Sequence, residues 1–151
     1  MSGIPTDTSV ALQHAVVIVD DSEDDRYLLQ TLLKKAGIAG AMLSFEDGRC
    51  AVDFLASQAG KSDPPAVMFL DINMPRMNGH EVLKWVRQQA WLKPMRIVVL
   101  SGSTLYADIK QAAELGADYY FEKYPAGETL RQLVAGDTVT RSGSLAQACA
   151  S

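Results

Sequence analysis

Three short apolar runs, each ending on a polar residue, constrain the fold of this sequence most. They read AVVIVD over residues 15–20, AVMFLD over 66–71 and RIVVLS over 96–101. The runs are rich in β-branched residues and do not alternate apolar with polar positions, which is typical of strands buried on both faces. Such strands belong to parallel sheets that are covered by helices on both sides.

Segments with helical spacing separate these strands. The predicted helices run from Ser22 to Gly37 and over 48–58, 79–91, 105–115 and 126–135, and weaker strands are predicted at 41–45 and 118–121. Five strands that alternate with five helices predict an α/β fold built from βαβ units. We therefore expect a parallel sheet with right-handed crossovers and helices on both faces.

Polar residues close four of the predicted strands. Because the carboxyl ends of parallel strands meet at one edge of the sheet, ligands are expected to bind at that edge. The residues that close these strands are Asp20, Asp21, Asp71, Ser101 and Lys123. The pattern thus places all the candidate chemical groups together.

The three carboxylates of this edge should repel one another, and an unaided cluster raises the pKa of at least one member. An open site rich in oxygen suits Mg²⁺, which takes carboxylates, a carbonyl and waters and leaves room for a phosphoryl oxygen. Lys123 supplies a second cation. A carboxylate between a divalent metal and a lysine is well arranged as a nucleophile toward a phosphoryl group, because both cations neutralise charge on the transferring oxygens.

From Val16 to Val134, the chain resembles the receiver domain of response regulators, the phosphoacceptor module of two-component signalling. That family has an acid pair after the first strand, an aspartate after the third in a context like LDxxMPxMxG, a Thr or Ser after the fourth and a Lys after the fifth. Here residues 70–79 read LDINMPRMNG, and the other positions hold the residues named above. The resemblance implies a flavodoxin-like, doubly wound sheet of strand order 2-1-3-4-5.

The family's roles carry over residue by residue. By resemblance, Asp71 is the phosphoacceptor. Asp21, helped by Asp20, would hold Mg²⁺. Asp71 itself and the backbone carbonyl of Asn73 would complete the set of protein ligands. Lys123 would then pair with the phosphoryl group.

Two further residues would report the modification. By the same resemblance, Ser101 would bond a phosphoryl oxygen once Asp71 is modified. Tyr120 occupies the family's aromatic switch position, whose ring turns inward when that hydroxyl moves. The mechanism is a two-state equilibrium biased by a new charge.

The loop after Lys123 departs from the family pattern. Family members usually have a proline directly after this lysine, in a cis bond, whereas here Tyr124 intervenes and the proline is Pro125. We expect the cis bond either to have moved or to be absent. Lys123 keeps its spacing of 22 residues from Ser101, so the charge is still assigned to it.

Two stretches of the sequence indicate a subgroup of the receiver family and its partners. They read DSEDDRYLLQ at residues 21–30 and LDINMPRMNGHEVLKWVR at residues 70–87. They look similar to stand-alone regulators that work with phytochrome-like and other sensor kinases. This implies a sensor histidine kinase or a histidine phosphotransfer protein as partner, with homodimer formation left open. We expect no separate enzymatic activity beyond self-catalysed phosphorylation and dephosphorylation.

Three further acids follow the acid pair. Glu23, Asp24 and Asp25 are interpreted as charges that favour the start of a helix.

Other functions stay open at this point. A phosphohydrolase with an aspartyl-phosphate intermediate resembles DxDx[TV], but the second acid position is Asn73 here. A degenerate receiver would bind partners without phosphorylation, and the altered loop at Tyr124 favours that alternative. A flavodoxin-like cofactor binder would need a hydroxyl-rich phosphate loop where the acid pair stands.

Charge and composition narrow the surroundings in which the protein works. The net charge is −4 and no run of Lys or Arg exceeds Lys34-Lys35, which argues against a nucleic-acid partner. No apolar stretch approaches the roughly 20 residues of a membrane span. Cys50 and Cys149 show no disulfide pattern, and a cytoplasmic protein is expected. We predict an N-terminal extension at 1–13, a receiver domain at 14–136 and a mobile tail at 137–151.

Overall fold

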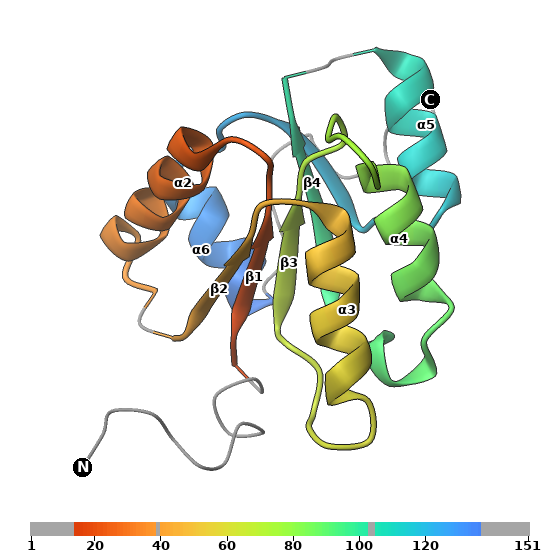
Figure 1. The fold of residues 1–151 in the computed structure, drawn as a ribbon. Coiled ribbons are helices and arrows are strands. Elements are labelled where there is room, and N and C mark those ends of the chain that lie inside the picture. The colour runs from red at the N-terminus through yellow and green to blue at the C-terminus, as the bar shows by residue number, and fades with distance from the viewer. Residues whose placement is uncertain (1–13, 39, 103–104, 137–151) are drawn as a thin grey trace, which may run out of the picture.

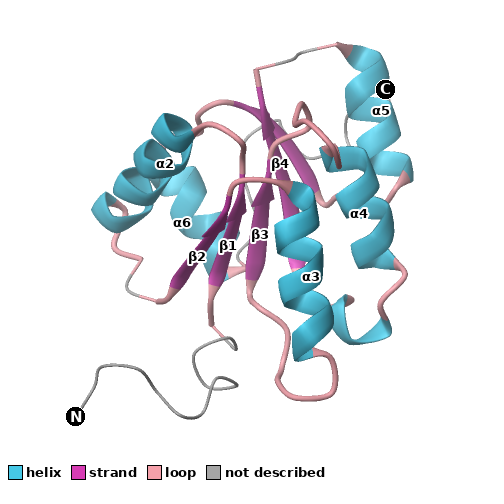
Figure 2. Ribbon diagram, in the orientation of Figure 1, coloured by secondary structure: helices cyan, strands magenta, loops and turns pink. Residues whose placement is uncertain are grey.

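The computed structural model describes residues 14–38, 40–102 and 105–136. Within these residues a five-stranded parallel sheet has the order β2-β1-β3-β4-β5, which confirms the predicted doubly wound α/β fold. Helices α2 and α6 cover one face of the sheet, and α3, α4 and α5 cover the other (Figures 1 and 2). The elements are β1 (Val16–Val19), α2 (Glu23–Lys35), β2 (Met42–Phe45), α3 (Gly48–Gln58), β3 (Val67–Leu70), α4 (Gly79–Arg87), β4 (Arg96–Ser101), α5 (Tyr106–Glu114), β5 (Tyr119–Glu122) and α6 (Gly127–Ala135).

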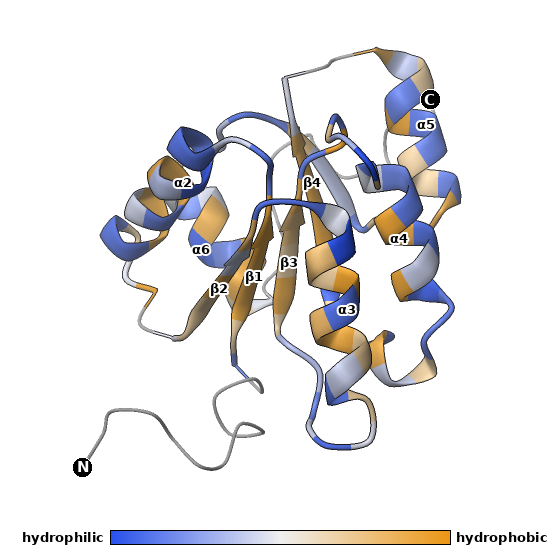
Figure 3. Cartoon of the chain, in the orientation of Figure 1, coloured by the Kyte–Doolittle hydropathy of each residue, from blue (hydrophilic) through white to orange (hydrophobic). Residues whose placement is uncertain are grey.

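The central strands are hydrophobic and lie between the two helical layers, as the colouring of Figure 3 shows. Every residue of β1 and β3 is buried. Their side chains point alternately into two apolar clusters. Val16 and Ile18 pack toward α2 and α6, whereas Val17 and Val19 pack toward the opposite helices. Burying a side chain of this size stabilises the fold by about 1.5–3 kcal/mol, which holds the strand ends in fixed positions.

Three helices begin with side-chain caps near the carboxyl edge of the sheet. Ser22 Oγ accepts a hydrogen bond from the Asp25 N–H at 3.2 Å. Asp47 and Asn78 cap α3 and α4 in the same way, and Asn78 forms a reciprocal capping box with Glu81. Each cap satisfies an amide that a helix leaves unpaired in its first turn.

The helix predicted over 79–91 is shorter in the structure. It ends at Arg87, and a 3₁₀ turn at Ala90–Leu92 follows. The side-chain amide of Gln89 donates to the Trp85 carbonyl at 3.1 Å and so takes up an acceptor of the last helical turn. The short turn then carries its final residue into the core, where it is fully buried.

The end of the described domain is tied to the sheet. Arg96, at the start of β4, donates hydrogen bonds to the carbonyls of Leu133 and Val134 in the last turn of α6. The predicted extension at 1–13 and tail at 137–151 lie outside the described residues. In the part of the chain that the structure describes, we find no helix with the length and apolar character needed to cross a membrane.

Candidate functional site

Four segments bring the predicted site residues to one edge of the sheet, at the top of Figure 1. Asp20 and Asp21 follow β1, Asp71 follows β3, Ser101 ends β4 and Lys123 follows β5. The Asp71 N–H still donates to the Val19 carbonyl at 2.9 Å, and the Lys123 N–H donates to the Ser101 carbonyl at 3.1 Å. Sheet pairing therefore extends to the site and fixes the backbone beneath these side chains.

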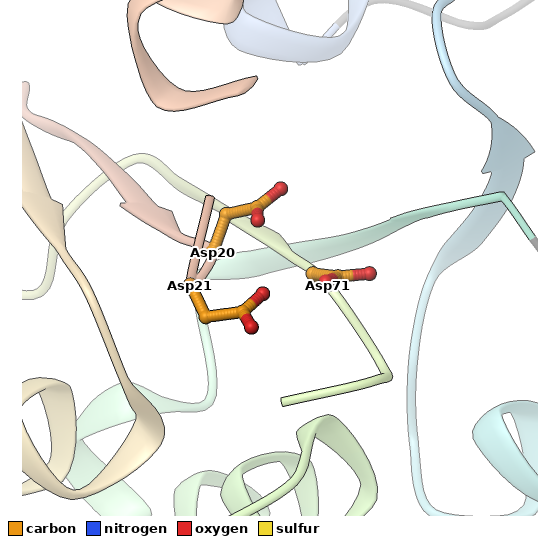
Figure 4. A group of neighbouring side chains, drawn as sticks. All are labelled: Asp20, Asp21 and Asp71. Carbon is orange, nitrogen blue, oxygen red and sulfur yellow. The ribbon is translucent and has the colours of Figure 1, made fainter. Parts of the chain in front are cut away.

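The carboxylates of Asp20, Asp21 and Asp71 form one cluster. One oxygen from each lies within 4.8 Å of the other two, and the three groups project to the same side (Figure 4). Asp20 and Asp71 are buried, whereas Asp21 is exposed, so the cluster opens toward solvent at one side. Carboxylate oxygens in this arrangement suit a hard divalent cation that keeps part of its water shell. The residues present therefore fit such an ion.

Lys123 lies beside the acidic cluster. Its Nζ donates to Asp20 Oδ2 at 2.7 Å and to Asp25 Oδ2 at 2.9 Å, and it lies 4.0 Å from Asp71 Oδ1. Burial lowers the pKa of the Lys123 ammonium, but its hydrogen bonds to Asp20 and Asp25 outweigh this effect and raise its pKa above the usual value. Lys123 is therefore a fixed positive charge at neutral pH.

The carboxyl group of Asp71 has a strongly raised pKa. Burial, together with the negative charge of Asp20, raises its pKa to about 6. Lys123 opposes this rise, Asp21 adds to it, and the backbone N–H of Asn73 lowers the pKa again. The neighbouring groups therefore do not fully offset the cost of a negative charge on Asp71, and a bound cation would stabilise the ionised carboxylate.

The loop between β3 and α4 is held by an ion pair with a buried acid. Arg76 adopts a left-handed backbone conformation with φ of 65°, and its guanidinium pairs with Asp47. The Asp47 residue is 2% exposed and also caps α3, so it has two roles. The same loop carries Asn73, whose N–H lies beside the Asp71 carboxylate. The metal-binding role of the Asn73 carbonyl stays a prediction.

The two predicted switch residues lie inside the domain. Ser101 is fully buried at the end of β4. Tyr120, in β5, is 6% exposed and belongs to the apolar cluster beneath α3, α4 and α5. The ring therefore points inward in this structure, toward the side of the sheet that carries α5.

Asp25 is a site residue that the sequence interpretation missed. Its hydrogen bond from Lys123, and secondly the nearby Tyr124 hydroxyl, hold the pKa of the Asp25 carboxyl below its usual range. The Tyr124 oxygen is buried, although it has no hydrogen-bond partner of standard geometry among the described residues. Asp25 also lies in the first turn of α2, as a helix-start charge should. Its place one turn beyond the acid pair was the available signal.

The expectation that the cis bond had moved or disappeared is wrong. The peptide bond that directly follows the lysine, between Lys123 and Tyr124, is cis. It therefore stays at the family's position, although the next residue is a tyrosine and Pro125 comes one residue later. The last helix begins at Gly127, two residues past that proline.

Comparison with known proteins gives a consistent result. Residues 16–135 match the family described as the response regulator receiver domain. The chain is 32% identical over 123 residues to the response regulator Rcp1 of Synechocystis sp., over 80% of this chain and 84% of that protein. The Mn²⁺-bound structure of Rcp1 superimposes with a TM-score of 0.65 at 32% identity, over 81% of this chain and 89% of that one. The structure of the phosphorylated cyanobacterial phytochrome response regulator RcpA superimposes with a TM-score of 0.68 at 29% identity. The match covers 82% of this chain and 90% of the RcpA chain.

The fold and the edge cluster define a doubly wound α/β domain with an acidic site for a divalent cation. Within that class, the chain belongs to the response regulator receiver domain family. It is homologous to two-component response regulators, including regulators associated with phytochromes. Receiver domains bind a divalent metal and accept a phosphoryl group on an aspartate, and the family is not one of classical enzymes.

Proposed function

We propose that this protein is a response regulator in which Asp71 accepts the phosphoryl group. One observation carries the proposal. The Asp71 carboxylate lies within 4.8 Å of the two other carboxylates that could bind a cation, and 4.0 Å from the Lys123 ammonium. A nucleophile with a cation site and a fixed positive charge beside it suits attack on an anionic phosphoryl group.

We propose that Mg²⁺ occupies the acidic cluster. Asp20, Asp21 and Asp71 would hold it together with the backbone carbonyl of Asn73. When bound, the ion would neutralise charge on the phosphoryl oxygens. The donor set of hard oxygen ligands supports this choice, and so does the Mn²⁺-bound form of the related Rcp1.

Two of the side chains described above take part directly in the transfer step. An oxygen of Asp71 attacks the phosphorus of a phosphohistidine donor, the P–N bond breaks, and its electron pair returns to the imidazole. Lys123 stays protonated and pairs with the phosphoryl oxygens, and the product is an acyl phosphate on Asp71. Attack by water on this phosphorus would later release inorganic phosphate and restore the carboxylate.

The conformational response would run through Ser101 and Tyr120. We propose that the Ser101 hydroxyl moves to a phosphoryl oxygen and that the Tyr120 ring occupies the space beside it. The burial of both side chains supports a coupled rearrangement, because packed interiors switch between discrete states. The readout would be protein contact with a downstream partner.

The phosphodonor would be a sensor histidine kinase or a histidine phosphotransfer protein in the cytoplasm. The similarity to RcpA, a phytochrome response regulator by name, supports a phytochrome-like kinase as one such donor. We further propose that the receiver domain spans residues 14–136. We also propose that the protein catalyses its own phosphorylation from small phosphodonors, and that two copies of the protein can form a homodimer.

Phosphorylation is directly testable by intact mass. With Mg²⁺ and acetyl phosphate, we expect the wild-type protein to gain one phosphoryl group, and Asp71→Asn to gain none. A chelator should prevent the adduct. Asp53→Asn is the matched control, because Asp53 is an exposed acid on α3 that pairs with Arg49. This variant should be modified like the wild type.

The other outcomes point to other functions. A wild-type protein that stays unmodified would favour a binding module that works without phosphorylation. Repeated turnover of phosphate esters would favour a phosphohydrolase with an aspartyl-phosphate intermediate. An adduct that persists in Asp71→Asn would reject Asp71 as the acceptor.

A further inference from the structure

Lys123 is shared between two acids and lies farther from the third. Its ammonium is 2.7 Å from Asp20 and 2.9 Å from Asp25, but 4.0 Å from Asp71. The first two distances are hydrogen bonds, whereas the third exceeds hydrogen-bond range. In this structure the lysine is therefore held by groups other than the proposed nucleophile.

Asp25 is a well-fixed member of this arrangement. Its N–H donates to the Ser22 hydroxyl at 3.2 Å, which anchors it in the first turn of α2. Its side chain is 35% exposed and lines the same small cavity as Asp71, Lys123 and Tyr124. A carboxylate anchored in this way offers the lysine a partner that does not depend on the metal cluster.

We propose that Asp25 is a positioning residue that draws Lys123 away from Asp71, so that a phosphoryl group on Asp71 must compete with Asp25 for the ammonium. This inference rests on the proposed function. An ammonium has three donors on a flexible stem and can exchange one acceptor for another by a small rotation. The Asp25 contact would thus limit how tightly the site holds its phosphoryl group.

The exchange would also carry a signal. When Lys123 leaves Asp25 for the phosphoryl group, the first turn of α2 loses its ion pair with the lysine, and Tyr124, which lines the same cavity, loses a neighbouring charge. Both segments would then be free to adjust. The state of Asp71 would therefore be reported at α2 as well as through the serine of β4.

Beryllofluoride is the probe for this inference, because it coordinates an aspartate carboxylate and mimics a phosphoryl group. Its affinity can be measured at saturating Mg²⁺ by fluorine NMR of the bound species. We expect Asp25→Asn to bind about fivefold more tightly than the wild type. Asp24→Asn is the matched control, because Asp24 is its exposed neighbour on the same turn, and we expect a change below about twofold.

Two more variants separate positioning from a purely structural effect. Asp25→Glu keeps an anion within reach of Lys123 and should return the affinity to near the wild-type value. Asp25→Ser, a second uncharged variant, should act like Asp25→Asn and covers the case in which the latter folds poorly. Unchanged or weaker binding in both uncharged variants, or equal effects of Asp24→Asn and Asp25→Asn, would overturn the inference. A wild-type protein that binds no beryllofluoride would reject the proposed function itself.

Discussion

Replacing Asp71 with asparagine should raise the free energy of unfolding of the metal-free protein by about 2–3 kcal/mol at pH 7. The folded protein raises the pKa of this carboxyl from 3.8 to about 6, first through burial and then through the charge of Asp20. Its ionised form is therefore disfavoured in the folded state. Asparagine has a similar shape and carries no charge to desolvate.

The pH dependence follows from the sign of that shift. Between about pH 4 and pH 6 the folded state binds more protons at Asp71 than the unfolded state, so wild-type stability falls as the pH rises through this window. The gain from Asp71→Asn should therefore be full above about pH 6 and vanish below about pH 4. Urea unfolding in the presence of a chelator, at several pH values, measures it.

Asp53→Asn is again the control for this prediction. Its side chain is 67% exposed and pairs loosely with Arg49 at 3.6 Å, so the change should stay within about 0.5 kcal/mol at every pH. Added Mg²⁺ should stabilise the wild type more than Asp71→Asn, because the ion binds the folded wild type better. If Asp71→Asn raised the free energy of unfolding equally at every pH, the destabilisation could not come from the ionised Asp71 carboxylate.

A second large effect is expected at Gly79, the first residue of α4. A Cβ atom there would lie 2.3 Å from the Asp71 carbonyl oxygen and 2.7 Å from the Ile72 Cα. Both are backbone atoms next to the strand end and cannot rotate away. We expect Gly79→Ala to lower the free energy of unfolding by about 3–5 kcal/mol and to slow phosphorylation, because the backbone of Asp71 must shift.

Gly127 provides a matched control. It is also the first residue of a helix, α6, but a Cβ there would meet only the Ala36 Cβ at 4.0 Å. Gly127→Ala should change stability by less than about 1 kcal/mol, with a gain favoured by alanine's higher helix propensity. Urea unfolding of both variants makes the comparison. Equal effects would show that the close approach at Gly79 does not constrain the site.

The sheet and its functional edge could be predicted from the sequence because the apolar runs and the polar residues that end them point to the same arrangement. The runs that end at Asp20 and Asp71 are apolar throughout, and such strands have one stable place in an α/β domain. Parallel pairing then brings their ends together with no further information. The early end of α4 at Arg87 could not be predicted from local sequence, because it depends on tertiary packing: the turn that follows buries Leu92 in the core.

The details of the site depend on contacts between distant residues. Asp25 and Lys123 are 98 positions apart, and the spacing of one helical turn from the acid pair marks Asp24 as well as Asp25, so it does not single out the residue that meets the lysine. The pair between Arg76 and Asp47 likewise joins two loops whose residues are 29 positions apart in the sequence. Residue types and strand ends therefore predicted which groups meet, whereas the partner of each charge required the structure.

The most direct test of the central claim locates the phosphoryl group. Protein phosphorylated with acetyl phosphate and Mg²⁺ can be reduced with borohydride, which converts an acyl-phosphorylated aspartate to homoserine. The product is digested and sequenced by tandem mass spectrometry. We expect homoserine at Asp71 alone. Homoserine at Asp20, Asp21 or any other acid, with Asp71 intact, would contradict it.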